Sequence, residues 1–175
     1  MLDYISKNYP DIDLDLIKNT YFERAILLKD RLLEPGAIEL LDFLLTTSRN
    51  FCIMSYGDKG WQNLKILSAG LGDLPRLIVS SHKKGPLIAD WFNKSSCQYI
   101  VPKECFSDNN PRIARAIILI DDKISAFNGL PDNARGYLVM GSANRVRPIG
   151  RISSRVKRVN RIDEIISLET QSTAE

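Results

Sequence analysis

The chain has 175 residues, a formal net charge of +3, 44% hydrophobic residues and 26% charged residues, which is the composition of a globular protein. It contains no apolar run of the roughly 18 residues that a membrane helix needs and no signal-peptide pattern. Its three cysteines lack metal-type spacing, and its single histidine excludes a histidine-based catalytic triad within the chain, so we expect a cytoplasmic protein with reduced thiols.

Helical and strand patterns alternate along the chain. Helices are expected over 14–33 (one helix or two short ones), 37–46, 60–69, 86–92, 124–128 and 162–168. Strands are expected over 51–55, 77–80, 117–120 and 137–140. Asp13 or Asp15 would cap the first helix. The stretch between 92 and Pro102 is expected to be irregular, and 170–175 to form a disordered tail.

The expected strands are continuously apolar, which is typical of strands buried on both faces of a parallel sheet. Strands separated by helices favour an α/β protein with a doubly wound parallel sheet. The length is that of a single domain.

The end of the first strand is a candidate phosphate site. Ser55 is followed by Tyr56, Gly57 and a helix start, where a hydroxyl, close backbone approach and unpaired N–H groups suit an anion. Lys84 begins a later helix and would neutralise the same phosphate, although Lys83 competes for that role. Taken singly, Ser55 is more ordinary as a helix cap and Lys84 as a surface lysine.

Asp121 and Asp122 follow another buried strand. Because the carboxyl ends of parallel strands meet at one edge, we expect this pair to converge with Ser55 in a shallow pocket. Two carboxylates with water molecules suit Mg²⁺, and without a cation they would repel each other. One aspartate of such a pair commonly serves as a helix cap instead.

Four segments taken in chain order resemble the haloacid dehalogenase (HAD) superfamily of phosphatases. They are Phe51–Asp58, Leu77–Ser80, Lys84–Pro86 and Ile117–Lys123. Ser55–Gln62, with Asp121–Lys123 and Ala126–Pro131, looks like a bacterial branch of HAD family hydrolases. The resemblance implies that Ser55 binds the transferring phosphoryl group together with Lys84, that both are catalytic residues, and that Asp121 and Asp122 hold Mg²⁺.

The resemblance also implies a domain organisation and a ligand. Residues 1–33 would be a small helical cap-like segment, 34–169 a Rossmann-like core of the HAD type, and 170–175 the tail. The substrate would be a small phosphorylated molecule, which the sequence does not identify.

The family's first motif, an apolar strand ending in Asp-x-Asp that supplies the nucleophile, has no counterpart in the sequence. The pattern occurs at Asp11–Asp15, but Pro10 precedes it and helix capping explains it better. We expect a natural product that begins upstream of Met1, and a chain that is inactive or impaired as written. In the family this strand is central to the sheet.

Seven bases and no acid lie between Arg145 and Arg161. This segment favours a second hypothesis, a non-catalytic module that binds a phosphorylated ligand or RNA, although no aromatic residue is interleaved to stack bases. A solvated connection before the last helix is the simpler interpretation. A receiver-like signalling domain is a third hypothesis, which the chain order of hydroxyl, lysine and aspartates disfavours.

Overall fold

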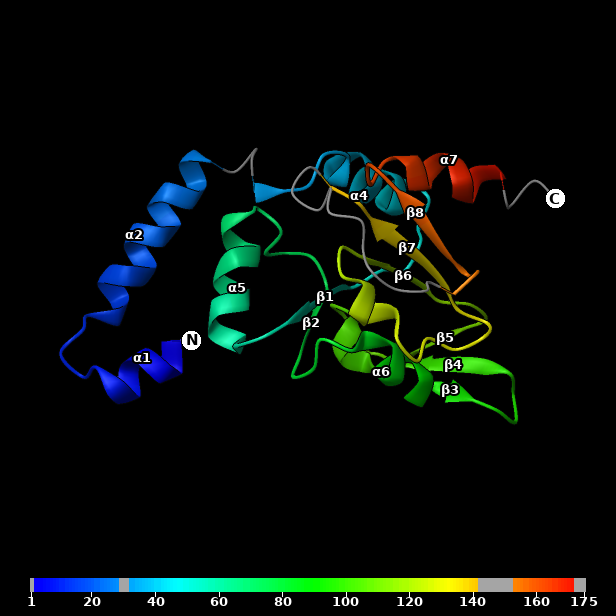
Figure 1. The fold of residues 1–175 in the computed structure, drawn as a ribbon, viewed down its shortest axis with the longest axis horizontal. Coiled ribbons are helices and arrows are strands. Elements are labelled where there is room, and N and C mark those ends of the chain that lie inside the picture. Colours follow the sequence, from blue (N-terminus) through cyan, green and yellow to red (C-terminus); the bar gives the residue numbers. More distant parts are fainter. Residues whose placement is uncertain (1, 29–31, 142–152, 172–175) are drawn as a thin grey trace. The chain divides into compact units, whose positions relative to one another are not determined.

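The computed structural model describes residues 2–28, 32–141 and 153–171. They form an α/β protein of helices and parallel strands, as the sequence predicts at that level (Figure 1). The chain divides into two compact units, Met1–Leu33 with Cys52–Ser81 and Glu34–Phe51 with His82–Glu175. Segment 52–81 groups with the N-terminal helices, and the domain boundary expected after residue 33 stays a prediction.

The first unit contains a parallel strand–helix–strand motif and the N-terminal helices. Its elements are α1 (Leu2–Asn8), α2 (Leu14–Leu27), β1 (Ile53–Tyr56), α5 (Lys59–Ser68) and β2 (Arg76–Val79). β1 and β2 run parallel, with Ser55 paired to Ile78. Helix α5 packs on α2, where the ring centroids of Trp61 and Tyr21 lie 4.7 Å apart. The end of β1 therefore lies directly before the start of α5.

The N-terminal aspartates belong to a helix start. The Asp13 carboxylate accepts hydrogen bonds from the backbone N–H groups of Asp15 and Leu16, both at 2.9 Å. The preceding segment Leu2–Asn8 is a helix and not a strand. Helix capping is therefore confirmed as the explanation of Asp13.

The second unit is larger and holds two sheets. Its elements are α4 (Ala37–Thr46), α6 (Lys84–Asp90), β3 (Phe92–Asn93), β4 (Gln98–Val101), η1 (Lys103–Cys105), β5 (Arg112–Ala114), β6 (Ile118–Asp121), η2 (Ile124–Phe127), β7 (Arg135–Val139), β8 (Val156–Val159) and α7 (Glu164–Gln171). β6, β7 and β8 form a parallel sheet in that order, and β3, β4 and β5 an antiparallel one.

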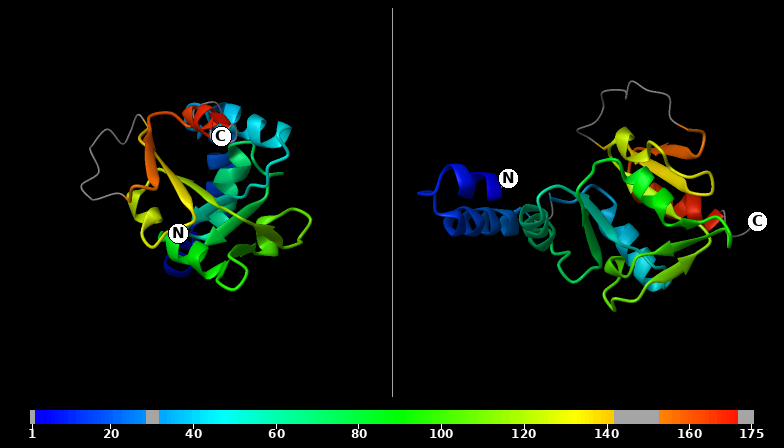
Figure 2. Two further views of the ribbon diagram at one scale, coloured as in Figure 1. Left: turned by 90° about the vertical axis from the view of Figure 1, so that its right-hand side faces the viewer. Right: turned by 90° about the horizontal axis from the view of Figure 1, so that it is seen from below.

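Both faces of the β6–β7–β8 sheet are covered, as the apolar strands predict. Figure 1 shows α4 and α7 on one side of this sheet and α6 on the other, and the left panel of Figure 2 shows the same order of layers from another direction. Successive residues of β7 alternate between the layers, since Tyr137 and Val139 pack with α4 and α7 while Leu138 packs with α6. The core of the unit therefore lies on both sides of β7.

The structure corrects three expectations in this unit. The stretch expected to be irregular between 92 and Pro102 contains β3 and β4. The basic segment contains β8, an edge strand, and not only a solvated connection. Helix α7 extends to Gln171, so Thr170 and Gln171, which were expected in the tail, are helical; the rest of the expected tail, 172–175, lies outside the described residues.

The described strands form three sheets, whereas one continuous parallel sheet was expected. Two are parallel, β1–β2 and β6–β7–β8, and the antiparallel sheet of short strands was not anticipated. No helix within the described ranges is long and apolar enough to cross a membrane. Cys52, Cys97 and Cys105 form no disulfide within the part of the chain that the structure describes.

Candidate functional site

Lys84 and Asp121 form a buried ion pair in the second unit. Lys84 is the first residue of α6 and Asp121 the last of β6. The Lys84 Nζ lies 2.6 Å from the Asp121 Oδ2, and the two side chains are 11% and 7% exposed. The pair joins two elements that are 37 residues apart in the sequence. Lys84, rather than the preceding Lys83, is therefore the lysine that reaches this strand end.

Close backbone packing fixes the start of α6 next to this pair. A Cβ atom added to Gly85 would lie 2.7 Å from the Leu130 backbone nitrogen and within contact of the Asn128 carbonyl oxygen. Backbone thus lies against backbone, which a side chain at residue 85 would prevent. Glycine at this position lets α6 approach the 128–130 segment and so sets the place of Lys84.

The carboxylate of Asp121 is engaged at both oxygens. Its Oδ1 accepts a hydrogen bond from the backbone N–H of Lys123 at 2.7 Å, while Oδ2 faces Lys84. Asp122 is exposed. Lys84 already balances one of the two negative charges, so repulsion between the aspartates does not by itself require a metal ion. Within the described ranges, no group of three or more His, Cys, Asp or Glu side chains could hold a metal ion.

Ser55 has a different partner in the first unit. Its hydroxyl donates a hydrogen bond to the Oε1 of Gln62 at 2.8 Å, and both residues are half-buried. Gln62 stands in the first half of α5, whose N-cap Asp58 accepts from the Trp61 N–H at 2.8 Å. Gly57, between strand and helix, has φ +136°, a backbone conformation that favours glycine. Gln62 was not among the residues predicted for the site.

The predicted site residues thus fall into two groups. Ser55, Tyr56 and Gly57 belong to the first unit, and Lys84 with the two aspartates to the second. The structure brings Lys84 and Asp121 together within one unit. Convergence of these two groups at one pocket stays a prediction.

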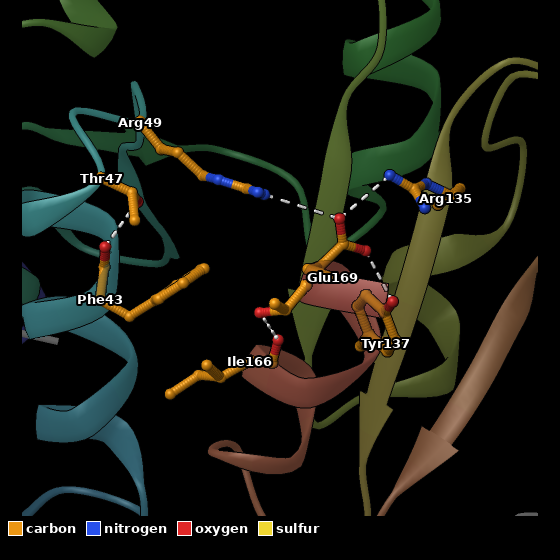
Figure 3. Close-up of polar contacts among 8 residues, drawn as sticks. Phe43, Thr47, Arg49, Arg135, Tyr137, Ile166 and Glu169 are labelled. Carbon is orange, nitrogen blue, oxygen red and sulfur yellow. Dashed lines mark hydrogen bonds and ion pairs between the residues drawn. The ribbon is translucent and has the colours of Figure 1, made fainter. Parts of the chain in front are cut away.

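A second buried polar cluster surrounds Glu169 on α7 (Figure 3). Glu169 is only 4% exposed, and its carboxylate accepts a hydrogen bond from the Tyr137 hydroxyl at 2.7 Å. Arg135 lies 3.1 Å and Arg49 3.7 Å from its Oε2. Burial of the phenol, and then its bond to Glu169, raise the pKa of Tyr137 to about 12. The cluster ties α7 to β7 and to the segment that follows α4.

Aspartates compensate two of the positive charges in the basic segment, 145–161. Arg155 pairs with Asp132, and the Nε of Arg161 lies 2.9 Å from Asp163. Lys157 and Arg158 are exposed on β8. The remaining bases of the segment, Arg145, Arg147 and Arg151, lie outside the described residues.

Comparison with known proteins finds no matching family model, no matching curated protein and no matching solved structure. The fold and its side-chain geometry therefore carry the functional argument.

Proposed function

We propose that the chain is a HAD-like protein that binds the phosphate group of a small phosphorylated molecule. In this proposal it descends from enzymes that hydrolyse phosphate monoesters. The supporting observation is the buried contact of 2.6 Å between Lys84 and Asp121. A lysine at a helix start and an aspartate at a parallel strand end are two parts that the family resemblance implies for one phosphate site. Their meeting is not a consequence of sequence proximity.

Electrostatics gives Mg²⁺ a role in this proposal. Lys84 and the two aspartates together carry one net negative charge at neutral pH, which opposes a phosphate dianion. A divalent cation held by Asp122 and the remaining lone pairs of Asp121, with water as further ligands, would reverse that sign. Bound there, Mg²⁺ would neutralise phosphate charge. Because two carboxylates are few ligands, we propose a weak Mg²⁺ site that fills together with phosphate.

The proposal does not include turnover by the 175-residue polypeptide. No apolar strand ending in Asp-x-Asp is present in its sequence, and Asp13 caps α2. In the family, that motif supplies the carboxylate that attacks phosphorus. Binding without hydrolysis is therefore the function proposed for this polypeptide, and hydrolysis would require a nucleophile from elsewhere.

The experiment is a titration with inorganic phosphate, followed by calorimetry with and without Mg²⁺. Lys84→Met should lower phosphate affinity by roughly tenfold or more, because a charge-assisted contact is lost. Lys83→Met is the matched control, since it removes an equal charge one residue away, and it should leave affinity within about twofold. Equal effects of the two substitutions, or phosphate affinity that is independent of Mg²⁺, would contradict the proposal.

A further inference from the structure

The hydroxyl of Ser55 is already committed to a side chain of its own unit. It donates a hydrogen bond to the Oε1 of Gln62 at 2.8 Å. We propose that Gln62 is a positioning residue that sets the direction of the Ser55 O–H bond. In the arrangement observed this bond points to Gln62, and it turns away from Gln62 when an oxyanion binds. The inference rests on the proposed phosphate binding and adds Ser55 as a phosphate ligand, which the family resemblance implies.

The hydrogen-bonding capacity of a serine makes this control necessary. A hydroxyl has one donor and two acceptor lone pairs, and a phosphate dianion presents only acceptors. While Gln62 accepts the Ser55 proton, Ser55 has only lone pairs to offer, and these repel an oxyanion. The Ser55 hydroxyl can therefore donate to phosphate only after its O–H bond has turned away from Gln62.

The carboxamide of Gln62 can make this change without leaving its place. A half-turn about its last side-chain bond exchanges oxygen and nitrogen, which have nearly the same size. The Nε2 then donates to the Ser55 oxygen, and the Ser55 O–H becomes free to donate to the anion. No proton is transferred between residues, because each hydrogen stays on its own heavy atom.

Gly57 provides the room for this amide. A Cβ atom on Gly57 would lie 2.8 Å from the Gln62 Nε2, so the amide occupies the space that any other side chain would take. The position of Gly57 is held by the hydrogen bond from its N–H to the Val79 carbonyl oxygen at 3.3 Å. The Gln62 side chain is therefore placed across the loop that joins the Ser55 strand to α5.

The test compares two substitutions of Gln62 in Mg²⁺-containing buffer, with inorganic phosphate as the probe. Gln62→Met keeps length and helix propensity and removes the amide. It should raise phosphate affinity by about threefold to tenfold, because the hydroxyl no longer has to give up a hydrogen bond. Gln62→Glu can only accept the Ser55 proton, and its added charge repels phosphate, so affinity should fall by about tenfold or more.

A double-mutant cycle separates control of Ser55 from a structural role. In the Ser55→Ala background, Gln62→Met should change phosphate affinity by less than about twofold, because the hydroxyl it acts on is gone. Ser68→Ala, which removes another hydroxyl of the same helix, is the matched control and should leave affinity unchanged. In nitrogen-15 spectra, phosphate should shift the Gln62 side-chain amide signals of the wild type but not those of Ser55→Ala.

The possible outcomes distinguish the two proposals. If the wild type does not bind phosphate, both the proposed function and the role of Gln62 are wrong. If the wild type binds phosphate but Ser55→Ala binds it equally well, the roles of Ser55 and Gln62 are wrong while the proposed function at Lys84 stands. If Ser55→Ala weakens binding while Gln62→Met binds like the wild type or more weakly, the role of Gln62 alone is overturned. An equal gain from Gln62→Met with and without Ser55 would also overturn it.

Discussion

The ammonium group of Lys84 lies 2.6 Å from the Asp121 carboxylate, although one residue begins a helix and the other ends a strand. Little solvent reaches either side chain, so the contact compensates both charges where water does so only weakly. Removing one partner of such a pair leaves an uncompensated charge in the interior, which is more costly than removing both.

Lys84→Met should therefore lower the free energy of unfolding by about 3 kcal/mol, measured by urea denaturation. The double variant Lys84→Met with Asp121→Asn should recover most of that loss, because the orphaned charge disappears. Phosphate binding should not return in the double variant. A single-variant loss below about 1 kcal/mol would show that water reaches the Asp121 carboxylate.

The Tyr137–Glu169 contact predicts a fall in stability at high pH. The pKa of Tyr137 is about 12 in the folded chain and near 10 when unfolded, so the folded state holds the phenolic proton more tightly. The contribution of this group to the free energy of unfolding is fully present below pH 10 and is lost as pH rises from about 10 to 12. The loss should approach 2–3 kcal/mol and should be followed by urea unfolding at several pH values.

Tyr137→Phe is the matched control for this titration, because it keeps the ring and removes the proton. It should cost about 1–2 kcal/mol at neutral pH, where Glu169 loses a hydrogen-bond donor, and it should flatten the decline above pH 10. Some decline should remain, since burial also raises the pKa of Tyr99. An unchanged pH profile in Tyr137→Phe would show that other groups cause the fall.

Hydrolysis of p-nitrophenyl phosphate by the 175-residue polypeptide should stay at background, because loss of a nucleophile costs about 10⁴-fold or more. Asp13→Ala should instead lower stability by about 1 kcal/mol through loss of the α2 cap. Mg²⁺-dependent turnover that Asp13→Asn abolishes would mean that the N-terminal aspartates are catalytic after all.

Nucleic-acid binding by the basic segment should be weak. Binding to single-stranded RNA should disappear near physiological salt, because Arg155 and Arg161 pair with aspartates. Replacing Lys157 and Arg158 with alanine should reduce the slope of log affinity against log salt by about 1.4, that is, two contacts. Sub-micromolar binding at physiological salt, measured by fluorescence anisotropy, would instead favour an RNA-binding module.

Local patterns in the sequence predicted the elements that carry their own signals. The helix over 37–46 has a continuous apolar face and begins after Gly36, and the structure places α4 at those residues. A cap at Asp13 or Asp15 was predicted because such a side chain acts on the next turn, and the structure has the cap at Asp13. Strand ends near Ser55 and Asp121 were located to within one residue, because each strand is an apolar run followed by polar residues.

Longer-range features gave weaker signals. β8 has exposed Lys157 and Arg158 between buried valines, so its charges resemble those of a solvated connection. The partners of Glu169 come from β7 and from the segment after α4, and no spacing along the chain relates them. The short strands β3 and β5 have two and three residues, too few for a repeating pattern. Gln62 was missed because its contact with Ser55 spans a tight turn.

The close packing at Gly85 restricts which sequences can share this architecture. Because its neighbours at 128–130 are backbone atoms, no exchange of side chains there could make space for a larger residue. A distant relative that keeps α6 against this segment should therefore retain glycine after its lysine, however far the rest has diverged. A search pattern that joins Lys84–Pro86 to Asp121–Asp122 and to Asn128–Leu130 would select for this geometry more directly than overall similarity does.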